Sequence, residues 1–150
     1  MTTSRRAAAG DLAADFLPHT APFLLLDRIV AIDGPTGRFM KHVTAADPLL
    51  SADGELSPLL LVEAMAQGAG IVLGRQEPEL RARGAVLAAI DHCEVTGTAG
   101  IGDQLEVEIT VVRRYAGMAR IRARASVGPR TCATAVLTLA FAPDLSQATE

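Results

Sequence analysis

The chain has 150 residues, enough for one folded domain with one core and too few for two ordinary domains. Hydrophobic residues make up 49% of it and aromatic residues only 3%. This composition excludes a disordered chain and predicts a core filled by Leu, Val, Ile and Ala. The net charge of −3 gives no electrostatic basis for binding nucleic acid.

The amino terminus and the two cysteines indicate the compartment. Met1 to Arg6 are followed by small residues and Asp11 rather than by a long apolar run, which predicts no signal peptide. No segment approaches the roughly 18 uninterrupted apolar residues of a membrane span. Cys93 and Cys132 each lie in an alternating apolar stretch, which predicts small buried side chains and no disulfide framework. We therefore expect a soluble protein of the reducing cytoplasm.

The first part of the chain predicts a tail and two strands. Residues 1–14 are predicted to form a flexible tail, and residues 15–22, which contain two prolines, predict a short helix or turn. The apolar run over 23–30 predicts a first strand. A turn over 33–37 then leads into an alternating second strand over 38–44.

A strongly apolar helix is predicted next. Ser57 suits the N-cap and Pro58 suits the first turn. Over residues 59–73 the only strongly polar residues are Glu63 and Gln67. A helix that is apolar almost all round must be buried on nearly every side.

Two glycines interrupt this helix. Gly68 and Gly70 each weaken it by roughly 1 kcal/mol relative to alanine. We expect close approach of a neighbouring part of the chain to compensate at both positions.

The rest of the chain predicts a charged linker over 75–83 and then four strands, over 86–95, 104–115, 118–127 and 131–141. One or two strands, a long buried helix and four consecutive strands predict an α+β fold in which an antiparallel sheet wraps around the helix. The predicted domain spans residues 15–142, and residues 143–150 are predicted to form a second tail.

The neighbouring strands predicted over 104–115 and 118–127 form a hairpin. A two-residue loop would place the arginine-bearing face of one strand against the apolar face of the other. We therefore expect a three-residue loop over 115–117, with Gly117 in the left-handed conformation.

The hairpin places Glu106 and Glu108 on the same face as a row of arginines, Arg120, Arg122 and Arg124. The row is interpreted either as a solvated sheet face or as a docking patch for an acidic protein partner. The sequence does not separate these interpretations.

Four segments resemble the β-hydroxyacyl-(acyl carrier protein) dehydratases of bacterial fatty-acid synthesis. They are the opening motif LPHTAPFLLLDR (17–28), the helix motif LVEAMAQ (61–67), the Ile90-Asp91 pair and the GDQL segment (102–105). They occur in the family's order and at near-family spacing over about residues 15–142. The resemblance implies a hot-dog fold, a dimer and an acyl tunnel at the dimer interface, with an acyl carrier protein presenting the thioester.

In this family a histidine of one subunit acts with an acidic residue on the central helix of the other. The resemblance places Glu63 at the acidic position, and we interpret Gln67, one turn further on, as a positioning residue. Dehydration removes an α-proton and protonates a leaving hydroxyl, so it needs a base and an acid side by side. A carboxyl group in an apolar tunnel suits the acid.

The family's catalytic histidine has no counterpart in the expected loop. Its position falls on Leu49, and Pro58, which has no amide hydrogen, stands at a usual glycine. His19 belongs to the opening motif and is interpreted as a structural hydrogen-bonding residue. His42 and His92 are interpreted as surface or sheet residues. No metal-ligand spacing, phosphate loop or nucleophile elbow is present in the sequence, so no cofactor is predicted.

The loop ADGEL (52–56), which leads into the helix with Glu63 and Gln67, is similar to that of a divergent branch of dehydratase-like proteins from aryl-polyene and related lipid pathways. Three functions follow for this chain. The first is a 3-hydroxyacyl-(acyl carrier protein) dehydratase, or the Glu-bearing subunit of a hetero-oligomeric one whose partner supplies the histidine. The alternatives are a non-catalytic acyl-binding subunit and a thioesterase that uses Glu63.

Overall fold

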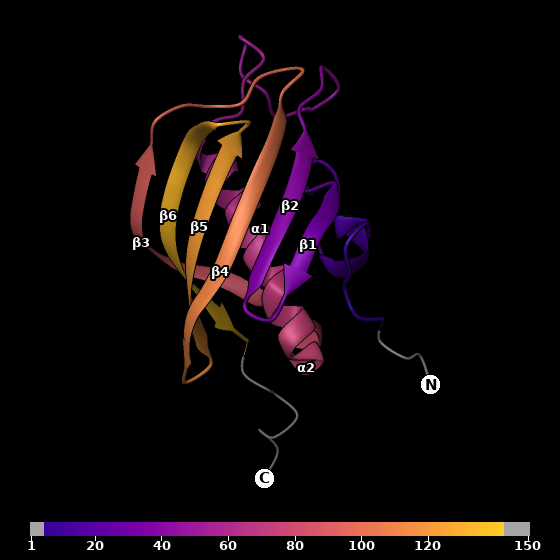
Figure 1. Ribbon diagram of the computed structural model, residues 1–150, viewed down its shortest axis with the longest axis vertical. Coiled ribbons are helices and arrows are strands. Elements are labelled where there is room, and N and C mark those ends of the chain that lie inside the picture. Colours follow the sequence, from indigo (N-terminus) through magenta and orange to yellow (C-terminus); the bar gives the residue numbers. More distant parts are fainter. Residues whose placement is uncertain (1–4, 143–150) are drawn as a thin grey trace.

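The computed structural model describes residues 5–142. Its elements in chain order are the 3-10 helix η1 (Ala13–Phe16), β1 (Arg28–Asp33), β2 (Thr36–His42), α1 (Pro58–Gln76), α2 (Pro78–Arg83), β3 (Ala85–Val95), β4 (Gln104–Tyr115), β5 (Met118–Val127) and β6 (Arg130–Phe141). The six strands form one antiparallel sheet in the order β1-β2-β4-β5-β6-β3, which curves around α1 (Figure 1). This is the predicted α+β arrangement, the hot-dog fold.

The central helix α1 begins and is buried as predicted. Ser57 caps it by accepting a hydrogen bond from the Leu60 amide at 3.4 Å, and Pro58 occupies its first turn. Its buried side chains, Met65 among them, pack against the inward faces of β2, β4, β5 and β6. The helix continues to Gln76, and the predicted linker after it folds into α2. Within residues 5–142 no helix is long and apolar enough to cross a membrane.

The two helix glycines have different surroundings. A Cβ atom at Gly68 would lie 3.0 Å from Phe39 Cδ2 and 3.1 Å from Ile109 Cγ1, so the predicted close approach is confirmed there. A Cβ atom at Gly70 would have no atom of a neighbouring segment of residues 5–142 within 4 Å, so the prediction is wrong at that position.

The β4–β5 hairpin closes with two residues rather than the predicted three. Tyr115 pairs with Met118, and Ala116 and Gly117 both have positive φ, of 46° and 76°, as a tight turn of this kind requires. A β-bulge at Val112 shifts the register, so that Val111 faces Ile121 and apolar side chains still meet. The prediction failed because it placed the extra residue in the loop instead of in the strand.

The predicted flexible tail over 1–14 is wrong for the residues that the structure describes. Ala7 is buried and its carbonyl accepts a hydrogen bond from Arg75 on α1 at 2.8 Å. Backbone hydrogen bonds join Gly10 and Asp11 to Ile29 of β1. This segment therefore adds to the edge of the sheet. The predicted tail over 143–150 lies outside the described residues.

Strand β3 is the free edge of the sheet beyond β6, and all of its residues are exposed. Apolar Val86, Leu87, Ile90 and Val95 are among them. Cys93 is exposed too, contrary to its predicted burial, whereas Cys132 on β6 is buried as predicted. The difference arises because β3 is an edge strand whose side chains are all exposed within residues 5–142, whereas β6 has strands on both sides and faces the core.

Candidate active site

Glu63 and Gln67 lie one helical turn apart on α1, so their side chains share a face. The Gln67 amide nitrogen donates to Glu63 Oε1 at 3.1 Å. Gln67 is 2% exposed, whereas about a third of the Glu63 side chain is exposed. The predicted pair therefore consists of a partly exposed carboxylate, Glu63, and a buried amide, Gln67, that donates a hydrogen bond to it.

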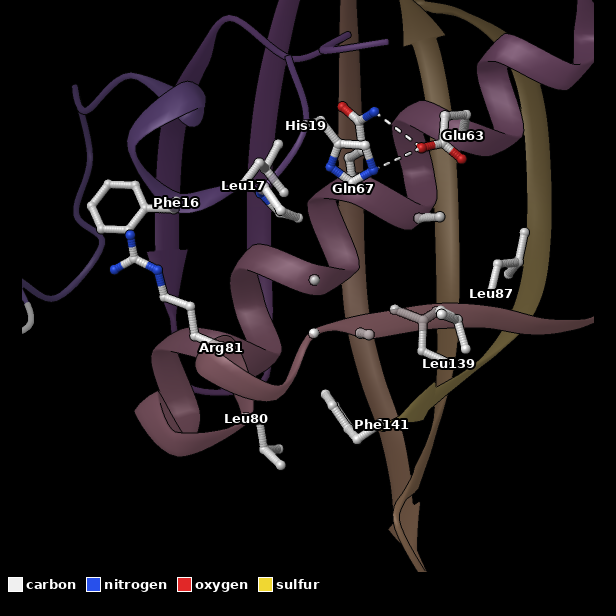
Figure 2. A pocket seen from close by; sticks show the side chains of 17 residues that line it. Phe16, Leu17, His19, Glu63, Gln67, Leu80, Arg81, Leu87, Leu139 and Phe141 are labelled. Carbon is white, nitrogen blue, oxygen red and sulfur yellow. Dashed lines mark hydrogen bonds and ion pairs between the residues drawn. The ribbon is translucent and has the colours of Figure 1, made fainter. Parts of the chain in front are cut away.

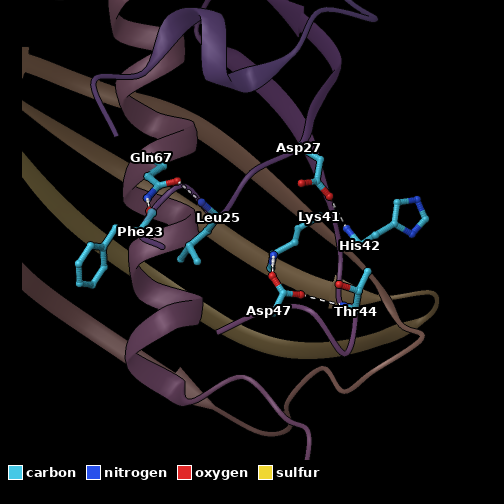
Figure 3. Close-up of polar contacts among 8 residues, drawn as sticks. All are labelled: Phe23, Leu25, Asp27, Lys41, His42, Thr44, Asp47 and Gln67. Atoms are coloured by element: carbon cyan, nitrogen blue, oxygen red, sulfur yellow. Dashed lines mark hydrogen bonds and ion pairs between the residues drawn. The ribbon is translucent and has the colours of Figure 1, made fainter. Parts of the chain in front are cut away.

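The Gln67 amide also holds the opening motif in place (Figure 3). Its nitrogen donates to the Phe23 carbonyl oxygen at 2.6 Å, and its oxygen accepts from the Leu25 amide at 3.0 Å. Buried amides need such partners. Because Phe23 and Leu25 bond to Gln67 of α1 in this way, the first strand begins at Arg28 rather than at Phe23 as predicted.

The opening motif brings His19 to the carboxylate. His19 Nε2 lies 3.3 Å from Glu63 Oε1, the oxygen that Gln67 also contacts (Figure 2). His19 Nδ1 is buried and has no hydrogen-bond partner within the described part of the chain. The sequence interpretation gave His19 a structural role and missed this contact. The sequence did hold a signal for this contact, because a carboxylate on an apolar helix needs a hydrogen-bonding partner.

A cavity of about 450 Å³ opens beside Glu63. His19 and Glu63 line one part of it, and Leu80 of α2 and Phe141 of β6 line another, as Figure 2 shows. Most of the remaining wall is apolar or glycine. A mostly apolar cavity with a few polar groups gathered in one place is typical of a small-molecule site.

The other candidate residues lie away from this cavity. Leu49 is half-buried in the loop before α1, and no histidine occurs in that loop. His42 is exposed at the end of β2, and His92 is exposed on β3. None of the three is among the residues that line the cavity. His19 is thus the histidine that the fold brings to Glu63 within this chain.

A partly buried ion pair holds the loop between β2 and α1. Lys41, 3% exposed, donates to Asp47 Oδ1 at 2.8 Å, and the Thr44 amide donates to Asp47 Oδ2 at 2.8 Å (Figure 3). Burial would raise the pKa of Asp47, but these hydrogen bonds and the Lys41 charge outweigh it and lower the pKa below its ordinary value. Among residues 5–142, no group of three or more His, Cys, Asp or Glu side chains is arranged to hold a metal ion.

The class of protein that the fold and the site define is a hot-dog domain with a carboxylate of its central helix at an apolar cavity. The family model described as ApeP-like, ApeP dehydratase, matches residues 12–150. The chain belongs to this dehydratase family, which confirms the predicted resemblance.

Relatives of known function are similar over most of the chain. It is 35% identical over 133 residues to the 3-hydroxyacyl-[acyl-carrier-protein] dehydratase FabZ of Caldanaerobacter subterraneus, covering 85% of this chain and 94% of that one. The FabZ of a Thermoanaerobacter species is 36% identical over 126 residues, covering 81% and 88%. These relatives are dehydratases, in agreement with the dehydratase family to which this chain belongs.

Solved structures share the fold. The dehydratase heterocomplex ApeI:P from Xenorhabdus doucetiae superposes with a TM-score of 0.79 and 18% identity, covering 93% of this chain and 99% of that one. The E. coli PaaI protein of the phenylacetic acid degradation operon gives a TM-score of 0.62 and 15% identity, covering 75% and 80%. At these identities the likeness shows the hot-dog fold alone.

Proposed function

We propose that this chain is the Glu-bearing subunit of a dehydratase that acts on 3-hydroxyacyl thioesters of an acyl carrier protein in fatty-acid or polyketide-type lipid synthesis. The observation that carries the proposal is the Glu63 carboxylate, oriented by Gln67 and His19 where an apolar cavity opens. The names of the FabZ relatives support this substrate class.

Glu63 is the acid of the proposed reaction. Gln67 and His19 both contact Oε1, which leaves Oε2 to face the substrate. Glu63 gives its proton to the 3-hydroxyl group, which leaves as water. A base removes a proton from C2, and the electron pair of that C–H bond becomes the C2–C3 double bond. Transfer of the abstracted proton back to Glu63 completes the cycle.

The base is proposed to come from a second hot-dog subunit, because the loop before α1 holds no histidine in this chain. Strand β3 supports such an association. Its eleven residues are exposed and its outer edge is unpaired within the described chain, so its amide and carbonyl groups are free to pair with another strand. The partner strand belongs either to a copy of this chain or to a different hot-dog subunit.

The experiment measures hydration of a 2-enoyl thioester, the reverse reaction, by this chain with hot-dog proteins encoded beside it. Glu63→Gln keeps the size and the contact with Gln67 but removes the transferable proton. We expect kcat to fall about 100-fold or more, since general acid catalysis contributes factors of that order. Gln67→Ala should also lower kcat, because Glu63 loses the amide that orients it.

A matched control is Glu106→Gln, a carboxylate of β4 that is about a third exposed, like Glu63, and pairs with Arg38 on the outer face. It should keep wild-type activity. Full activity of Glu63→Gln would overturn the role of Glu63. Release of free acid from a saturated acyl thioester would indicate a thioesterase, and binding of acyl thioesters without turnover would indicate a non-catalytic subunit.

A further inference from the structure

One face of α1 forms a wall of the cavity. Glu63, Gln67, Gly70 and Gly74 all line it, at spacings of four, three and four residues. Side chains at such spacings lie in a row along one side of a helix. The row begins at the carboxylate and continues toward α2 with two residues that have no side chain.

The glycine at position 70 has no structural use that the fold reveals. Its φ is not in the left-handed region, and a Cβ atom there would have no heavy atom within 4 Å. Gly68 differs, because Phe39 and Ile109 pack closely on it. A glycine in a helix costs about 1 kcal/mol relative to alanine. What the missing side chain provides at position 70 is open space in the cavity.

The cavity is closed beyond this point by α2. A Cβ atom at Gly74 would lie 3.3 Å from Arg81 Cβ, so α2 packs directly on α1 there. Arg81 is anchored, because its guanidinium lies 4.8 Å from the centre of the Phe16 ring and donates to the Asp15 carbonyl oxygen. Leu80, 8% exposed, lines the same closed part.

We propose that Gly70 sets the length of the acyl chain that the cavity accepts, with the reacting carbons at Glu63 and the alkyl tail lying along α1 past Gly70 toward α2. This rests on the proposed function and deepens it. Seven residues of helix from Glu63 to Gly70 span about 10 Å. An extended alkyl chain with C–C bonds of about 1.5 Å advances roughly 1.3 Å per carbon. Position 70 is therefore reached about eight carbons beyond C3, in chains of roughly eleven carbons or more.

The test compares 2-enoyl pantetheine thioesters of 6, 8, 10, 12 and 14 carbons, hydrated by the chain together with its hot-dog partner. Gly70→Leu should lower the kcat/KM ratio of the 14-carbon to the 6-carbon substrate at least tenfold, with the break between the 10-carbon and 12-carbon substrates. Gly70→Ala, which adds one carbon atom, should give a smaller shift of the same sign. Leu59→Ala, at an exposed α1 position outside the cavity, is the control and should leave the ratio unchanged.

An equal loss at every chain length in a folded Gly70→Leu variant would overturn the proposal, as would an unchanged ratio. If Gly70→Leu does not fold, Leu80→Ala tests the proposal at the α2 end of the cavity. Widening the cavity at α2 should raise the 14-carbon to 8-carbon ratio, and an unchanged ratio would count against the proposal.

A binding measurement separates this proposal from the proposed function. Saturated acyl pantetheine thioesters of the same lengths are titrated into wild-type protein and Gly70→Leu by calorimetry. If wild type hydrates no substrate but Gly70→Leu still loses affinity only for the long chains, the dehydratase proposal fails and the chain-length proposal stands. If affinity does not depend on chain length in either protein, the chain-length proposal fails.

Discussion

Glu63 owes its orientation to two side chains from different parts of the chain. Gln67 lies one turn away on the same helix, whereas His19 reaches Glu63 from the segment before β1. Both contact Oε1, so the carboxylate is held by one oxygen. Small displacements of a catalytic group cost rate even when the group itself is intact.

His19→Ala should therefore lower kcat with little change in KM. We expect a loss of about tenfold, the kinetic equivalent of one hydrogen bond of about 1.4 kcal/mol. His19→Gln, whose amide nitrogen reaches a similar position, should recover most of the rate. Steady-state kinetics of enoyl thioester hydration measure both. A purely structural role would instead lower the melting temperature of His19→Ala and leave kcat of the folded protein unchanged.

The two α1 glycines give opposite stability predictions. Gly70→Ala should raise the free energy of unfolding by up to about 1 kcal/mol, because alanine is the better helix former and its methyl group meets open space. Gly68→Ala should lower it by about 1 to 3 kcal/mol, because Phe39 and Ile109 must move. Urea unfolding measures both, and destabilisation by Gly70→Ala would contradict the open cavity.

At the scale of elements, the β2–α1 connection depends on the ion pair between buried Lys41 and partly buried Asp47. Because the folded-state pKa of Asp47 is lowered, its contribution to stability is complete above the unfolded-state pKa of about 3.9 and is lost as the pH falls through the folded-state value. Asp47→Asn should lower the free energy of unfolding at pH 7 by about 2 to 3 kcal/mol, since Lys41 stays buried without its counter-charge.

Urea unfolding of wild type and Asp47→Asn between pH 7 and pH 3 checks this. The difference between the two proteins should shrink as the pH falls below about 4. Glu106→Gln, which breaks an exposed pair with Arg38, should change the free energy of unfolding by less than about 1 kcal/mol. A difference that stays constant with pH would rule out the charged pair as its source.

For the whole molecule, the exposed β3 edge predicts association. Ile90 on β3 and Val112 on β4 are almost equally exposed, at 48% and 49%. Ile90→Asp should weaken assembly with a second hot-dog subunit, because it places a charge in the proposed interface. Val112→Asp should leave assembly intact. Sedimentation velocity on the chain alone and with its partner measures this, and the reverse outcome would place the interface elsewhere.

Much of the fold could be predicted from local pattern. Residues 104–115 and 118–127 alternate in polarity, and β4 and β5 have these bounds. Ser57-Pro58 marked the start of α1, and the four-residue spacing of Glu63 and Gln67 predicted that they share a face. The arginine row on β5 is exposed, and its interpretation as a docking patch stays a prediction, as does the cytoplasmic location.

Other features depended on contacts between segments far apart in the chain. The packing of residues 7–13 on the sheet edge and the bonds from Gln67 to Phe23 and Leu25 each join such segments. The Val112 bulge lies between adjacent strands, but it too is a matter of strand pairing rather than of local pattern. Local periodicity reports which face of an element is apolar but not which distant residue will meet it. Contacts between strands depend on the strand register, and a single bulge changes that register.

The amino-acid sequence by itself determined the family, the hot-dog class and the helix that presents Glu63, because short-range polarity patterns and motifs specify them. Only the tertiary structure decided that His19 contacts Glu63, that Gly70 faces open space and that β3 is left uncovered. The reason is physical: each of these depends on where the sheet, curving around α1, places segments that the chain keeps far apart.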